Sequence, residues 1–141
     1  MLRIAAALCA IALASPLSAQ KPPAAAAALQ GTWIFQSINS QSAPEGSPEM
    51  TLTFSGANYQ QAAGGQVNER GTFKVATAKK PMTIDLTIVE GDDAGKTQLG
   101  IFEVSGDTLR ANFGRAGATT RPTDMTVKAE TLLLVAKKKK A

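Results

Sequence analysis

The chain has 141 residues, a formal net charge of +4 at pH 7, one cysteine and no histidine. Because Cys9 lies in an N-terminal segment that we expect to be removed, the mature chain lacks disulfides, a thiol nucleophile, the commonest general base and the commonest metal ligands. Without Arg3 and Lys137 to Lys140 the chain carries 10 basic and 11 acidic residues, so its body is near neutral and we expect no nucleic-acid partner.

Residues 1–19 have the features of a secretory signal peptide. Arg3 supplies the positive charge, Ile4 to Ala14 form an apolar stretch, and Ser15 to Ala19 form a polar end that contains a proline. The apolar stretch is about 11 residues long, whereas a membrane-spanning helix needs roughly 20. We therefore expect cleavage after Ala19 and a secreted or periplasmic protein that is not integral to the membrane.

Residues 20–28 form a Pro/Ala-rich linker before the folded domain. Pro22 and Pro23 prevent a helix at its start, and the run Ala24 to Ala28 is long enough for a single frayed turn at most. Isolated helices this short are marginal in water. We expect this segment to act as a tether.

From Gly31 onward the apolar residues recur with a period of two, which is typical of strands that have one buried face and one solvated face. The alternation is clearest at Met50 to Phe54 and at Met82 to Ile88. In chain order the expected strands are Thr32 to Ile38, Met50 to Phe54, Tyr59 to Ala62, the segment around Phe73 and Val75, Met82 to Ile88, Gln98 to Val104, Thr108 to Phe113, and Thr131 to Val135.

Short turn sequences separate most of these strands. The turns are Ser55-Gly56-Ala57-Asn58, Gly64-Gly65, Gly91 to Gly95, and Ser105-Gly106-Asp107. Eight strands joined in this way predict an all-β antiparallel meander, and closure into an up-and-down barrel removes its exposed edges. Pro44 and Pro48 mark a longer first loop that could fold over one mouth, and Arg115 to Asp124 form a second long connection.

The start of the meander, Leu29-Gln30-Gly31-Thr32-Trp33, resembles the Gly-x-Trp signature of the lipocalin and calycin barrels. Further short motifs follow in the order of a bacterial lipocalin-like domain family that is abundant in planctomycetes. They are Gly71 to Lys74, Lys80 to Leu86, Gly95 to Thr97, Gly100 to Glu103, Gly106 to Leu109, and Arg121 to Thr123. The resemblance covers Leu29 to Ala136 and implies an exported barrel domain with no established function.

Three residues are candidates for closing one end of this barrel. Gly31 lets the chain turn in from the linker, and Trp33 is expected to plug the end. In lipocalin-like barrels a late arginine crosses the face of this tryptophan, and the resemblance implies Arg121 for that role. The alternative is that Arg121 is an exposed loop residue.

An eight-stranded barrel is just wide enough to fill with its own side chains or to hold one small apolar ligand. The candidate lining residues are Phe35, Met50, Leu52, Phe54, Tyr59, Phe73, Val75, Ile84, Leu86, Ile88, Phe102 and Phe113. Our leading hypothesis is the non-enzymatic binding of a small hydrophobic ligand, without a cofactor. The alternative is a structural or protein-interaction module of the cell envelope with a filled core.

Few residues offer enzymatic chemistry. Gly91 to Thr97 differs from a phosphate-binding loop because three residues, not four, separate its glycines. The carboxylates of Asp85 and Glu103 lie on adjacent expected strands, where a pair can perform acid and base catalysis. Asp85 alternates with the apolar residues of its strand, however, so we expect both acids to be exposed strand charges and the domain not to be an enzyme.

The C-terminal residues 137–141 form a basic tail that carries Lys137, Lys138, Lys139 and Lys140. Such a run is usually a solvated end that aids solubility. The alternative is attraction to an anionic surface or an envelope protein, worth about 1 kcal/mol per lysine near a membrane.

Overall fold

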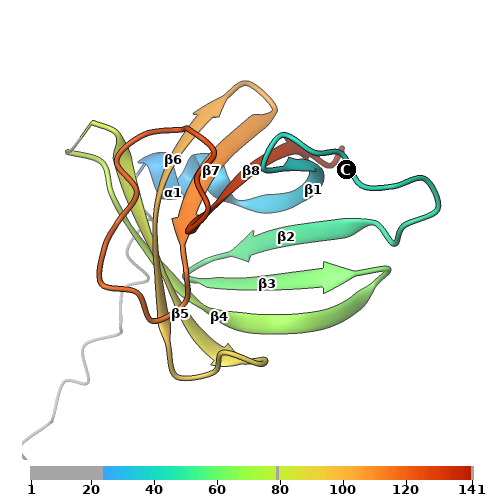
Figure 1. The fold of residues 1–141 in the computed structure, drawn as a ribbon, viewed down its shortest axis with the longest axis horizontal. Coiled ribbons are helices and arrows are strands. Elements are labelled where there is room, and N and C mark those ends of the chain that lie inside the picture. The colour runs from blue at the N-terminus through green and yellow to red at the C-terminus, as the bar shows by residue number, and fades with distance from the viewer. Residues whose placement is uncertain (1–23, 79, 141) are drawn as a thin grey trace, which may run out of the picture.

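A computed structural model describes residues 24–78 and 80–140, so the signal peptide predicted for residues 1–19 lies outside the described part. The elements are α1 (Ala24–Leu29), β1 (Gly31–Ile38), β2 (Met50–Ser55), β3 (Asn58–Ala63), β4 (Gln66–Ala76), β5 (Met82–Glu90), β6 (Thr97–Ser105), β7 (Thr108–Gly114) and β8 (Thr131–Lys138). The strands pair antiparallel in chain order, and β8 returns to β1 (Figure 1). The predicted all-β, eight-stranded up-and-down barrel is confirmed.

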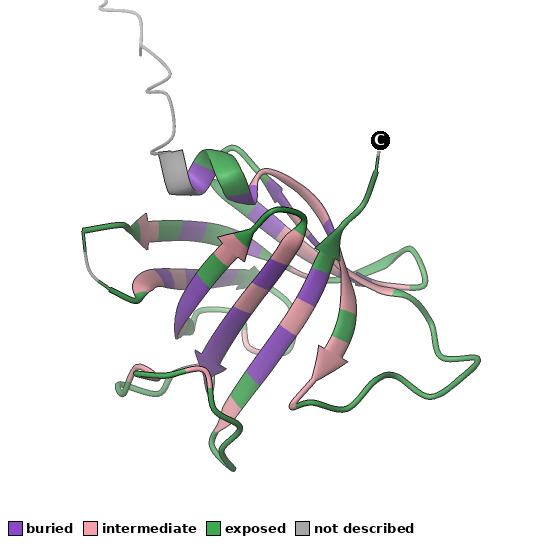
Figure 2. Cartoon of the chain, turned by 90° about the horizontal axis from the view of Figure 1, so that it is seen from above, coloured by how far each residue is buried: buried purple, intermediate pink, exposed green. Residues whose placement is uncertain are grey.

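Because every strand is antiparallel to the next, the connections alternate between the two ends of the barrel. The closed end carries α1, the turns β2–β3, β4–β5 and β6–β7, and the end of β8. The open end carries the first loop, residues 39–49, and the long β7–β8 connection, residues 115–130. Figure 2 shows α1 and the C-terminus together at one end, with the long loops at the other.

All eight strands extend beyond the predicted bounds, and β4 and β8 do so by the most residues. The first half of β4, Gln66 to Arg70, is largely exposed and polar, so it lacks the alternation that marks a strand. Its ladder to β3 holds it in place, with Gln61 opposite Glu69 and a bulge beside that pair. At the C-terminus β8 continues to Lys138, so two residues of the predicted tail belong to the barrel.

The barrel interior is filled by the chain's own side chains. Nine of the twelve predicted lining residues are buried: Leu52, Phe54, Tyr59, Phe73, Ile84, Leu86, Ile88, Phe102 and Phe113. Phe54 and Phe73 pack edge to face, with ring centroids 4.8 Å apart. Phe35 and Val75 are partly buried and pack against this core. These side chains pack against one another in the middle of the barrel.

The expected tether differs from the structure over Ala24 to Ala28, which form most of α1. Ala26 is 5% exposed and Leu29 is fully buried, and both belong to the hydrophobic core. The expectation was wrong here because it considered the helix in isolation. Docking of its apolar face onto the barrel supplies the stability that six residues lack on their own.

Trp33 lies fully buried beneath α1, as the plug prediction requires. Its indole N–H donates a 2.8 Å hydrogen bond to the carbonyl oxygen of Leu29, the last residue of the helix. The cation beside the ring is Lys138, whose Nζ lies 5.7 Å from the ring centroid. The prediction that Arg121 crosses the tryptophan was wrong, because strand register puts Lys138 opposite Trp33.

Gly31 turns the chain from α1 into β1 with a φ of +112°, a conformation that favours glycine. A Cβ at this position would also lie only 3.2 Å from Cε of Lys138. The closed end thus depends on the helix, the glycine turn, the indole and the end of β8 together.

We expect Trp33→Ala to lower the free energy of unfolding by about 3 to 5 kcal/mol, because it empties the space beneath α1. Urea unfolding followed by circular dichroism measures the change. Trp33→Phe, which keeps most of the volume but loses the N–H, should cost about 1 to 2 kcal/mol. An alanine variant as stable as the wild type would contradict the plug.

The docking of α1 can be tested with a matched pair of substitutions in the same helix. Ala26→Asp puts a carboxylate in the buried contact and should cost about 2 kcal/mol or more, whereas Ala27→Asp puts it in solvent and should cost less than about 0.5 kcal/mol. Urea unfolding midpoints of the two variants give the comparison. Equal midpoints would mean that α1 does not stabilise the barrel.

Candidate functional site

The first loop and the adjoining rim of the barrel enclose a cleft of about 530 Å³. Its apolar walls come from Phe35 and Ile38 at the end of β1 and from Met50 at the start of β2. The remaining lining residues are Gln36, Ser37, Asn39, Gln41, Ser42, Ala43, Pro44, Ser47, Pro48, Glu49 and Ala63. The walls are therefore hydrophobic, and the loop supplies amide and hydroxyl groups around them.

Asn39 fixes the start of the loop on β8. Its backbone N–H donates to the carbonyl oxygen of Leu133, and its side-chain Oδ1 accepts from the N–H of Leu133, both at 2.8 Å. Asn39 and Ser40 have φ angles of 51° and 66°, in the left-handed region, which asparagine tolerates better than most residues. This reversal directs the chain out of β1 and into the loop.

The end of the loop is held as well. The N–H of Gly64 donates to the carbonyl oxygen of Glu49 at 2.9 Å, which ties the loop to the β3–β4 turn. A further turn, in which the N–H of Ser47 donates to the carbonyl oxygen of Pro44 at 3.1 Å, shapes the middle of the loop. With both ends bonded and two prolines restricting the backbone, the cleft is preformed.

The charge of the cleft limits what it can bind. Glu49 is the charged residue of its lining, and no lysine or arginine belongs to that lining. An anionic head group would meet this carboxylate without a compensating cation, whereas the amides of Gln36 and Gln41 suit a neutral polar group. The cleft therefore favours uncharged apolar molecules.

Of the predicted lining residues, Phe35 and Met50 border this cleft, while most of the others form the core. Ile38 and Ala63 also line it and were missed, although the prolines of the first loop had marked its position. Tyr59 points its hydroxyl at Glu69, donating to Oε1 at 2.8 Å. Burial, and then the hydrogen bond to the Glu69 carboxylate, raise the pKa of this phenol, so it stays protonated.

Arg121 lies on the outer wall of the barrel, within the long β7–β8 connection. Its guanidinium donates to the carbonyl oxygens of Ile84 and Gly100 at 3.2 and 2.8 Å, and it pairs with Oδ1 of Asp85 at 2.6 Å. Since this connection leaves β7 at the open end, Arg121 cannot serve the closed end as predicted. It clamps the connection to β5 and β6 instead.

Asn112 provides a second clamp on the same wall. It is 1% exposed, and its Nδ2 donates to the carbonyl oxygens of Asp124 and Thr126 at 2.8 and 3.3 Å. The side-chain and backbone hydrogen bonds that Asp124 accepts from Thr126 lower the pKa of that carboxyl. The connection is thus an ordered cover over the outer face of β7.

The two carboxylates considered for catalysis lie apart. Asp85 faces outward, as expected, and pairs across the ladder with Leu99, four residues before Glu103 on β6. At ~3.3 Å per residue the two carboxylates are offset by about 13 Å along the strand, beyond the roughly 5 to 9.5 Å of catalytic carboxyl pairs. Glu103 pairs instead with Arg110 at 2.9 Å. Both acids thus form ion pairs on the outer wall of the barrel.

Residues 24–78 and 80–140 contain neither a candidate metal cluster nor a membrane-spanning helix. No group of three His, Cys, Asp or Glu side chains in this part is arranged to hold a metal ion. None of its helices has the length and apolar character needed to cross a membrane. Comparison of the chain with known protein families, curated proteins and solved structures found no match.

The clamp by Arg121 can be measured against a matched arginine. Arg121→Ala should lower the free energy of unfolding by about 2 kcal/mol, because the carbonyl oxygens of Ile84 and Gly100 and the carboxylate of Asp85 lose their hydrogen-bond donor. Arg115→Ala breaks only an exposed pair with Glu130, at 3.2 Å, and should cost less than about 0.5 kcal/mol. Urea unfolding distinguishes the two, and equal losses would show that the clamp contributes nothing.

Proposed function

We propose that this domain is a non-enzymatic binding module that takes a small, uncharged hydrophobic molecule in the first-loop cleft. The observation that carries the proposal is the apolar wall of Phe35, Ile38 and Met50, only partly buried, in a preformed hollow of about 530 Å³. Binding sites for small molecules commonly have volumes of roughly 300 to 1,000 Å³ and mostly apolar walls with a few polar groups.

The packed interior supports the rim, rather than the barrel centre, as the place of binding. Phe54, Phe73 and Phe102 occupy the space that a ligand in the centre would need. Opening that space would require removing aromatic side chains from a close-packed core. The cleft needs no such rearrangement, because the first loop already stands away from the rim.

The proposal includes export and kinship with bacterial lipocalin-like domains. Export is supported by the sequence features of residues 1–19. Kinship is supported by the barrel topology and by the Gly31-Thr32-Trp33 step, which lies at the closed end beneath a short helix. In this proposal the step contributes to stability and has no contact with the ligand.

A second candidate function is a structural or protein-interaction module of the cell envelope. The observation in its favour is the same filled interior, since a barrel with a complete core can act through its surface alone. In that case the cleft would hold only solvent or a side chain of a partner.

Fluorescent probes test the proposal. Nile red, which is neutral, should bind the purified protein more tightly than the anionic dye anilinonaphthalene sulfonate, because Glu49 repels the latter. Ile38→Gln and Met50→Gln should each weaken Nile red binding about tenfold, since each removes roughly 1.5 kcal/mol of apolar contact. Fluorescence titration gives the dissociation constants.

The matched controls are Val89→Gln and Val127→Gln, which change exposed apolar residues away from the cleft. They should leave the affinity for Nile red unchanged. Affinities that fall equally in all four variants, or no binding by the wild type, would reject the ligand proposal and favour the interaction module.

A further inference from the structure

We infer that the closed end of the barrel is a docking surface for anionic lipid headgroups, formed by Lys137, Lys139 and Lys140. This inference is independent of the proposed ligand. It starts from the finding that β8 carries the barrel into the lysine run, so that part of the run has a defined position.

Backbone hydrogen bonds hold the lysines in place. The N–H of Lys138 donates to the carbonyl oxygen of Asp107, and the N–H of Lys139 donates to that of Thr32, both at 2.8 Å. Side chains alternate along a strand, and Lys138 is the one that lies against Trp33. All four lysines are exposed, but Lys137, Lys139 and Lys140 lack the ring contact of Lys138 and are left for contacts outside the barrel.

These three lysines have no acidic partner among residues 24–78 and 80–140. The ion pairs of that part use Arg70, Lys96, Arg110, Arg115, Arg121 and Lys128. The positive charge of the three lysines is therefore uncompensated and concentrated within four consecutive residues.

Charge differs between the two ends of the barrel. The loops of the open end, which include the β5–β6 turn, carry six acidic residues, Glu45, Glu49, Asp92, Asp93, Asp124 and Glu130, against four basic residues, Lys96, Arg115, Arg121 and Lys128. The described turns of the closed end carry one acid, Asp107, and one base, Lys80, beside the lysine run. An anionic surface therefore attracts the closed end and repels the open end. Docked in this orientation, the barrel holds the first-loop cleft away from the membrane.

Lipid headgroups fit this surface better than a nucleic acid does. Single-stranded nucleic acids are held by aromatic stacking as well as by charge, and the aromatic ring that Lys138 contacts, Trp33, is fully buried. A membrane surface requires only the charges, and each lysine near an anionic leaflet adds measurably to binding.

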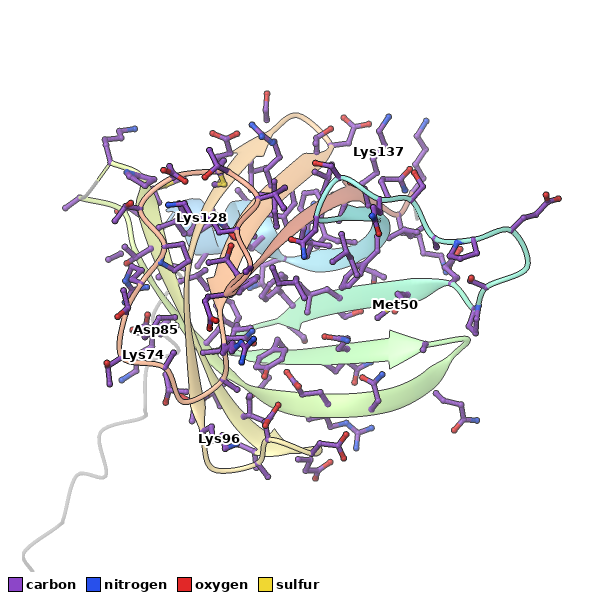
Figure 3. All side chains as sticks on the ribbon, in the orientation of Figure 1. Met50, Lys74, Asp85, Lys96, Lys128 and Lys137 are labelled. Carbon is purple, nitrogen blue, oxygen red and sulfur yellow. The ribbon has the colours of Figure 1, made fainter. Side chains whose placement is uncertain are left out.

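Vesicle sedimentation tests the inference with two triple variants of equal net charge. The tail variant is Lys137→Gln/Lys139→Gln/Lys140→Gln, and the control is Lys74→Gln/Lys96→Gln/Lys128→Gln. Figure 3 shows Lys137 well apart from Lys74, Lys96 and Lys128. All proteins carry the same N-terminal residues, so differences in binding report the lysines alone.

The wild type should bind vesicles of about one-third phosphatidylglycerol in phosphatidylcholine, and it should bind vesicles of phosphatidylcholine alone much more weakly. The tail variant should lose about a hundredfold in affinity, the control less than about threefold, and added salt should weaken the wild type. Three results would overturn the inference. They are equal losses of vesicle affinity in both variants, equal binding of the wild type to neutral and anionic vesicles, and tighter binding to single-stranded DNA than to the anionic vesicles. Nile red binding by the tail variant is expected to be unchanged, which separates this test from that of the cleft.

Discussion

The buried hydrogen bond from the Trp33 indole to the Leu29 carbonyl is the interaction on which the closed end of this barrel depends. A large aromatic side chain with a polar N–H can be buried at a barrel end only if that N–H finds an acceptor. Leu29 provides the acceptor because it ends α1, and α1 is stable because Ala26 and Leu29 pack on the core. The helix and the plug therefore stabilise each other.

Filling the interior moves every candidate for function to the outside of the barrel. Aromatic side chains occupy the centre, Arg121 and Asn112 fasten the long connection to the outer wall, and the first loop borders a cleft at the rim. Oδ1 of Asn112 accepts no hydrogen bond from the described residues. One unpaired buried oxygen lowers stability, and it accompanies the hydrogen bonds by which Nδ2 of Asn112 holds the β7–β8 connection. The two long connections at this end thus differ: side-chain clamps fasten the β7–β8 connection to the wall, whereas the first loop borders an apolar cleft.

The two ends of the barrel differ in charge as well as in structure. Acidic residues collect in the open-end loops, while Lys137, Lys139 and Lys140 extend from the closed end. Such a division gives the molecule an orientation in an electric field without changing its fold. This separation of charge is consistent with both proposals, because the closed end can approach an anionic surface while the open end presents the apolar cleft to solvent.

The barrel could be predicted from the amino-acid sequence, because the two-residue alternation of strands such as Met82 to Ile88 and the glycine turns between them are local signals. The sequence also located the first loop through its prolines, although not the cleft beneath it. Tertiary contacts were needed to place three features: the docked helix over Ala24 to Ala28, the polar first half of β4, and Lys138 rather than Arg121 beside Trp33. The helix and the lysine depend on partners distant in the chain, through burial against the core and the register between β1 and β8, and no local pattern encodes such a partner. The partner of residues 66–70 is β3, which directly precedes them, but their polar composition lacks the alternation that marks a strand.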